Sequence, residues 1–163
     1  MKNIPAHNPQ FVGIENLKKQ HFQQLQQFEN WAQNHDWNAF LLHHYDWWMF
    51  PIARTSAGQG AKYTIYQQEI LDLKSDAEFM KNFRRGVELL VLSWGWDIEN
   101  RSPISNPDHN QTWNHYEVRL GKMVDSLKLL GEQDYFNSIK EFFHSLPLDE
   151  QPKERWVRNL LEI

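Results

Sequence analysis

The chain has 163 residues, no cysteine and a formal net charge of −4 at pH 7. This length fits a single domain with a self-sufficient core, and the lack of cysteine excludes disulfides, cysteine-based zinc sites and a thiolate nucleophile. The acidic balance argues against nucleic acid as a partner. Without a signal peptide or roughly 18 uninterrupted apolar residues, we expect a soluble, cytoplasmic protein with no membrane insertion.

The first third of the chain predicts a long helix, a short helix and a loop. Between residues 13 and 34, apolar side chains recur at steps of three and four, which is the period of an amphipathic helix. The letters NHDWN end it, and a shorter helical piece fits Phe40–His43. Pro51 ends whatever precedes it, because the residue before a proline avoids helical angles. Residues 53–61, with the letters ARTSAGQGA, predict an exposed loop.

Two helices are predicted in the middle of the chain. The letters YTIY at 63–66 are typical of a short strand but have no evident partner, and QQEILDL after them favours a short helix. Ser75 and Glu78 are spaced as in a capping box. The apolar period that follows predicts a helix ending near Gly95.

The last third predicts three helices after a long connection. Residues 97–112 hold two prolines and many turn formers. Asn114 and Glu117 indicate a helix cap, and Gly131 fits the left-handed end of the helix that follows. Further helices are expected over 135–146 and, at the C-terminus, over 152–162. We therefore predict one all-α domain over residues 1–163, a compact bundle of roughly six helices with no significant sheet.

A basic stripe lies beside the apolar face of the helix after Asn114. His115, Arg119, Lys122 and Ser126 are four, three and four residues apart, so they share one side of that helix. Such a stripe could hold a carboxylate or phosphate, because arginine binds these groups bidentately and lysine adds a point charge. The alternative is a solvated helix face with incidental charges.

The segment HHYDWWMFP, residues 43–51, is either a pocket wall or part of the core, because aromatic side chains with polar groups suit both. Its adjacent histidines, His43 and His44, do not face the same ligand on a helix, and no HExxH spacing is present. The chain also lacks GxSxG, P-loop and GxGxxG motifs. We therefore predict no catalytic residue, metal or cofactor.

Two ordered motifs resemble the conserved domain of the opioid growth factor receptor family, and the resemblance spans about residues 11–146. The first motif consists of His43, Tyr45, Trp48, Phe50, Pro51 and Arg54. The second consists of His115, Arg119, Lys122, Ser126, Leu127 and Gly131. Between them, EILDLKSDAEFMKNFRRGVELLVLSWGW is similar to the family's short and long helices. Asp46 and Trp47 stand where the family usually has isoleucine and glutamine, and Gly121 stands where it usually has threonine.

The resemblance implies an all-α domain like that of the family's small, tail-less microbial members. The family's name implies a receptor for an enkephalin peptide. We predict a non-catalytic module that binds a peptide, a small anion or a protein partner; the sequence specifies neither ligand nor oligomeric state. The predicted ligand-binding residues are His43, Tyr45, Trp48, Arg54, His115, Arg119, Lys122 and Ser126. Two alternatives stay open: a hydrolytic or metal-dependent enzyme using His43 and His115, and a structural domain whose aromatic segment fills the core.

Overall fold

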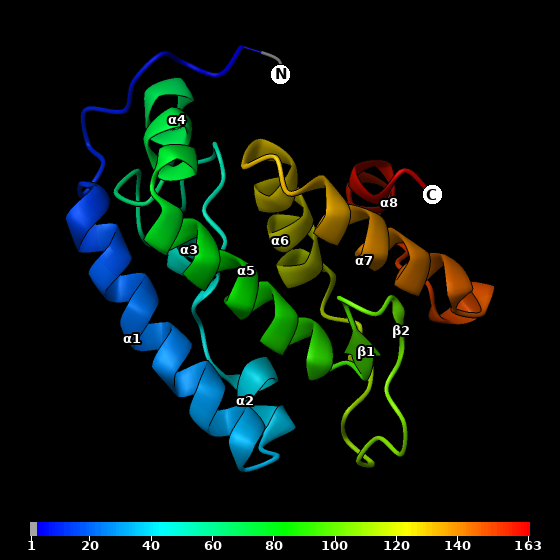
Figure 1. Ribbon diagram of the computed structural model, residues 1–163. Helices are drawn as coiled ribbons and strands as arrows, with labels where there is room; N and C mark the ends of the chain where they lie inside the picture. Colours follow the sequence, from blue (N-terminus) through cyan, green and yellow to red (C-terminus); the bar gives the residue numbers. More distant parts are fainter. Residues whose placement is uncertain (1–2) are drawn as a thin grey trace.

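A computed structural model describes residues 3–163 and confirms the all-α fold in one compact body (Figure 1). Its elements are α1 (Ile14–Gln33), α2 (Trp37–Leu42), α3 (Asp46–Met49), α4 (Gln67–Ser75), α5 (Ala77–Leu92), β1 (Trp96–Asp97), β2 (Ser102–Pro103), α6 (Glu117–Leu129), α7 (Gln133–Ser145), the 3₁₀ helix η1 (Leu148–Glu150) and α8 (Arg155–Leu161). Residues 3–163 thus form eight α-helices, more than the roughly six predicted. One reason is that the stretch before Pro51 forms two short helices, α2 and α3, rather than one.

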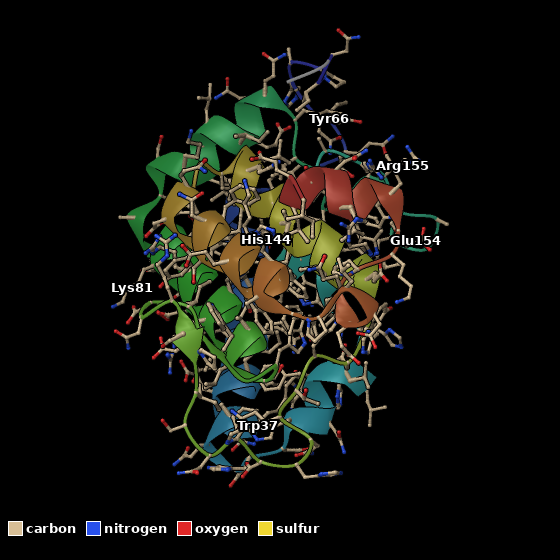
Figure 2. All side chains as sticks on the ribbon, turned by 90° about the vertical axis from the view of Figure 1, so that its right-hand side faces the viewer. Trp37, Tyr66, Lys81, His144, Glu154 and Arg155 are labelled. Carbon is tan, nitrogen blue, oxygen red and sulfur yellow. The ribbon has the colours of Figure 1, made fainter. Side chains whose placement is uncertain are left out.

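The helices form two groups around one core. Helices α1 and α5 pack along each other on one side, and α6, α7 and α8 pack together on the other (Figure 1). Figure 2 shows α8 lying across α6 and α7. The one-turn helix α3 contacts both α1 and α6, so it lies where the two groups meet.

The predicted start of the long central helix is wrong by one residue. Asp76, not Ser75, caps α5: its side chain accepts a hydrogen bond from the backbone N–H of Phe79 at 3.0 Å. Ser75 is the last residue of α4, and its hydroxyl donates to the carbonyl of Leu71 instead. Because α4 runs directly into the cap of α5, the two helices share a junction with no loop between them.

The predicted cap before α6 also differs from the observed arrangement. The Asn114 side chain accepts from the N–H of Tyr116, two residues on, in a turn that leads into α6. The Glu117 carboxylate accepts from the N–H groups of Lys153 and Glu154, which precede α8. Glu117 therefore ties the start of α8 to α6 rather than capping its own helix.

Loops and turns mostly follow the sequence. Gly131 ends α6 with a left-handed φ of +76°, as predicted. The connection over 97–112 begins within a small antiparallel hairpin, β1–β2, with Trp96 opposite Pro103. The C-terminal helix expected over 152–162 is α8. None of the helices formed by residues 3–163 has the length and apolar character needed to cross a membrane.

Candidate functional site

Half of the aromatic segment at 43–51 belongs to the core. Tyr45 and Phe50 are almost fully buried. The Tyr45 ring meets Phe28 edge to face with 4.7 Å between ring centres, and its hydroxyl donates to the carbonyl of Phe40. Burial raises the pKa of the Tyr45 hydroxyl well above its usual value. Tyr45 therefore acts as a packed core residue with a satisfied hydrogen bond.

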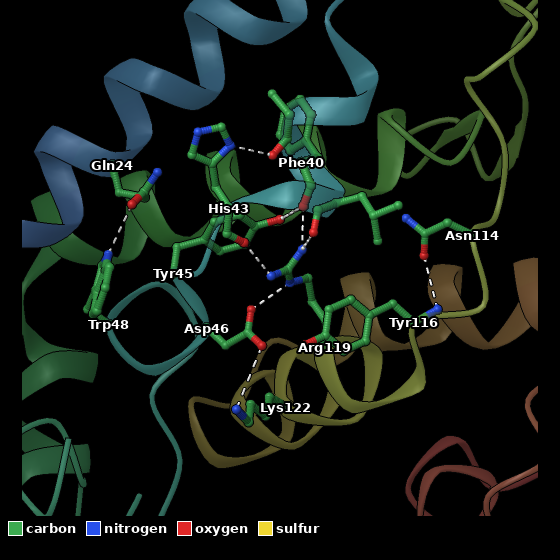
Figure 3. Close-up of polar contacts among 12 residues, drawn as sticks. Gln24, Phe40, His43, Tyr45, Asp46, Trp48, Asn114, Tyr116, Arg119 and Lys122 are labelled. Carbon is green, nitrogen blue, oxygen red and sulfur yellow. Dashed lines mark hydrogen bonds and ion pairs between the residues drawn. The ribbon is translucent and has the colours of Figure 1, made fainter. Parts of the chain in front are cut away.

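Arg119 extends from the first turns of α6 into the interior and is only 2% exposed. Its Nε donates to the Asp46 carboxylate at 2.6 Å, and its terminal nitrogens donate to the carbonyls of Phe40 and His43 (Figure 3). The bond to His43 is 2.6 Å long. Because Arg119 is buried, the alternative interpretation of the stripe as a solvated helix face is wrong at this residue. The stripe does hold a carboxylate, but the carboxylate belongs to the same chain.

The Arg119 guanidinium joins three elements. The last carbonyls of a helix have no partner within it, and Arg119 donates to two of those in α2, on Phe40 and Leu41. Its carbon Cζ lies 4.1 Å from the centre of the Tyr45 ring and 4.8 Å from that of Tyr116, so the cation is held between two aromatic rings. Asp46 is in the first turn of α3. Arg119 thus fixes α2 and α3 against α6, and each of its three guanidinium nitrogens donates at least one hydrogen bond within the chain.

Lys122 lies one turn further along α6 and is the accessible cation of the stripe. Its ammonium is 3.7 Å from the second oxygen of Asp46 and 3.8 Å from the centre of the Trp47 ring. The side chain is 14% exposed. Burial lowers the pKa of Lys122, and the Asp46 carboxylate opposes that shift. The Lys122 ammonium is therefore partly removed from water, and its ion pair with Asp46 is a long one that compensates only in part.

A cavity of about 210 Å³ opens beside Lys122. Its lining residues are His44, Tyr45, Asp46, Trp47, Trp48, Gln59, Tyr116 and Lys122. The ion-pair cluster at the cavity has one negative charge, on Asp46, and two positive charges, on Arg119 and Lys122. The net formal charge of these three side chains is +1, so a ligand with one negative charge would neutralise it.

The tryptophan side of this cavity is fixed by α1. The Trp48 Nε1 donates to the Gln24 side-chain oxygen at 3.2 Å, and the Trp48 ring packs against Tyr63 with 5.6 Å between ring centres (Figure 3). Gln24 is itself buried. Trp48 therefore presents a positioned ring to the cavity rather than a free surface side chain.

The two histidines proposed for an enzyme are not brought together at this cavity. The Nδ1 of His43 bonds the carbonyl of Ala39 at 3.0 Å, and the His43 ring packs against Trp31. The Nε2 of His115 is 2.9 Å from the Glu150 carboxylate. Neither histidine lines the cavity. In the part of the chain that the structure describes, no cluster of three or more histidines and carboxylates could hold a metal ion.

Two other predicted residues also lie apart from the cavity. Arg54 is exposed, and its guanidinium is 5.9 Å from the centre of the Trp156 ring on α8. Ser126 is fully buried, and its hydroxyl has no hydrogen-bond partner among residues 3–163. Of the eight residues predicted to bind a ligand, Tyr45, Trp48 and Lys122 line the cavity, and Arg119 lies behind it, bonded to Asp46.

Sequence reasoning missed the residues that complete the site. Asp46 and Trp47 are the partners of Lys122, and Tyr116 covers Arg119. The sequence signal at Asp46 and Trp47 is their place inside the aromatic segment 43–51. Comparison with protein-family models, with curated proteins and with solved structures finds no match to this chain.

Proposed function

We propose that the chain is a non-catalytic binding module, similar to the conserved domain of the opioid growth factor receptor family, and that it binds an anionic group in the cavity beside Lys122. The anion is a carboxylate or a similar small group, carried by a peptide or a small molecule. The observation that carries this proposal is the position of the Lys122 ammonium at the cavity, with a long ion pair and incomplete hydration.

The charges around the cavity favour an anion over a cation. Arg119 already has Asp46 within 2.6 Å, whereas Lys122 is 3.7 Å from the same carboxylate and forms the weaker pair. A ligand carboxylate can approach Lys122 without displacing Arg119, because Arg119 is bonded on the far side of Asp46 (Figure 3). Such a contact is charge-assisted and forms in a partly buried site, where it is stronger than in water.

A binding role fits the site better than hydrolysis does. An acid–base pair needs its members within hydrogen-bond reach of one reacting atom. His43 and His115 each have a partner of their own, Ala39 and Glu150, and neither lines the cavity. We therefore do not extend the proposal to catalysis.

The proposal is tested with two ligands that differ only in charge, N-acetylalanine and N-acetylalaninamide. Binding is followed through the indole N–H signals of Trp47 and Trp48 in a two-dimensional NMR titration. We expect the acid to shift these signals in a saturable way and the amide not to. Lys122→Met should weaken acid binding about tenfold or more, because a hydrogen bond to a charged group contributes about 1.5–3 kcal/mol.

The matched control is Lys81→Met. Lys81 is an exposed lysine of α5 that Figure 2 shows at the edge of the molecule. The Lys81→Met substitution removes the same charge from the chain at a position away from the cavity, so acid binding should persist. Equal affinity for acid and amide, or unchanged binding in Lys122→Met, would overturn the proposal.

A further inference from the structure

The cavity beside Lys122 has aromatic rings on several sides. The Trp47 ring has the Lys122 ammonium over its face. Trp48 is positioned by its bond to Gln24, and the Tyr116 ring packs over Arg119. Trp47, Trp48 and Tyr116 are all partly exposed and line the cavity, so part of each side chain reaches the cavity although each also packs against a neighbour. Aromatic rings attract other rings in offset or edge-to-face arrangements.

The size of the cavity limits what can enter. Its volume is about 210 Å³. Pockets for drug-sized ligands are about 300–1,000 Å³. The cavity is smaller than these pockets, so it suits a group the size of one six-membered ring with a short arm. An inorganic anion alone would reach Lys122 but leave the rings uncovered.

We propose that the ligand group is an aryl carboxylate, in which a flat aromatic ring carries a carboxylate on an arm of two or three bonds. The carboxylate pairs with Lys122, and the ring lies against Trp48 and Tyr116. This inference rests on the proposed function and specifies the chemistry of its ligand. Two sources share this chemistry: a free small acid, and the carboxyl-terminal aromatic residue of a peptide.

Three acids of equal charge test the role of the ring. The wild-type protein is titrated with propionate, 3-cyclohexylpropionate and 3-phenylpropionate, again reading the indole signals of Trp47 and Trp48. We expect 3-phenylpropionate to bind about tenfold more tightly than propionate and more tightly than the cyclohexyl acid, because only the phenyl ring offers a flat π-face. The tripeptide Ala-Ala-Phe, with a free or an amidated carboxyl end, then separates the two sources.

The outcomes separate this inference from the proposed function. If the three acids bind alike, or the cyclohexyl acid equals the phenyl acid, selection for an aromatic ring is overturned while anion binding stands. If no acid shifts the signals, both proposals fail. Trp48→Leu, read through the remaining Trp47 indole signal, should remove the preference for the phenyl acid over the cyclohexyl acid, provided that its melting curve shows a folded protein. Tight binding of 3-phenylpropionate but not of Ala-Ala-Phe assigns the free acid, and equal binding assigns the peptide terminus.

Discussion

Removing the Arg119 side chain should cost a large part of the stability of the domain. In Arg119→Met, the ion pair of the buried Asp46 carboxylate within residues 3–163 is reduced to the long contact with Lys122 at 3.7 Å. The His43 carbonyl loses its donor, whereas the Phe40 carbonyl keeps the Tyr45 hydroxyl. Breaking a buried ion pair from one side costs about 3–5 kcal/mol, and the lost hydrogen bond to the partly exposed His43 carbonyl adds about 0.5–1.5 kcal/mol. Single domains unfold with a free energy of about 5–15 kcal/mol. We therefore expect a loss of at least about 3 kcal/mol.

A double-mutant cycle separates the ion pair from the rest of this loss. Asp46→Leu alone leaves the Arg119 charge with carbonyl partners only, and the double variant Asp46→Leu/Arg119→Met removes both charges. The double variant should be more stable than the sum of the single losses predicts, by about 2–3 kcal/mol. Urea unfolding followed by tryptophan fluorescence gives all four free energies of unfolding.

The control is Arg155→Met, at an exposed position on α8 (Figure 2), which should change the free energy of unfolding by less than about 0.5 kcal/mol. A loss below about 1 kcal/mol in Arg119→Met, or single losses that simply add, would show that Arg119 does not join α2, α3 and α6 as the contacts indicate.

Three further predictions concern buried groups elsewhere. Burial lowers the pKa of His21 to about 4, so its neutral form contributes stability above pH 6.5 that is lost as the pH falls toward 4. His21→Phe should reduce this acid-dependent loss by about 3 kcal/mol, measured as the difference in unfolding free energy between pH 7 and pH 4. Burial raises the pKa of Glu88, so its negative charge opposes folding at neutral pH but not in acid, where the carboxyl group is protonated. Glu88→Gln should therefore raise the melting temperature at pH 7 by on the order of 1 °C. This gain should vanish at pH 4. A Cβ on Gly121 would lie 2.2 Å from the Trp156 ring, so Gly121→Ala should cost about 1–3 kcal/mol by urea unfolding, whereas Gly58→Ala, with 3.9 Å of space, should not show this overpacking cost.

The sequence predicted the long helices because their apolar period is a local property. The periods over 13–34 and after Glu78 match α1 and α5 closely. The caps were harder to assign, because Ser75 and Asp76 are both good capping residues and nothing local says where α4 ends. The extent of α4, which runs through Ser75, decides between them.

Only part of the site was predicted from the sequence, because the site depends on contacts between residues that are far apart in the chain. The period of α6 placed Arg119 beside the apolar face, which fits either a buried or a solvated side chain. The partner that decides its burial is Asp46, 73 residues earlier in the chain. No spacing rule links two residues at that separation, so the ion pair became visible only with the fold.

The question of whether residues 43–51 are core or pocket wall has a geometric answer in α3. In a single helical turn, residues three apart share a side and intervening residues point away from it. Asp46 and Met49 are buried, whereas Trp47 and Trp48 between them are partly exposed and line the cavity. One turn of helix thus divides the segment into a core side and a cavity side. Truncating Met49 should therefore lower the free energy of unfolding, measured in urea, while the Lys122 charge at the cavity is kept. Changing Trp48 should instead alter ligand preference at a smaller cost in stability. The reverse pattern would mean that the two sides of α3 have been assigned wrongly.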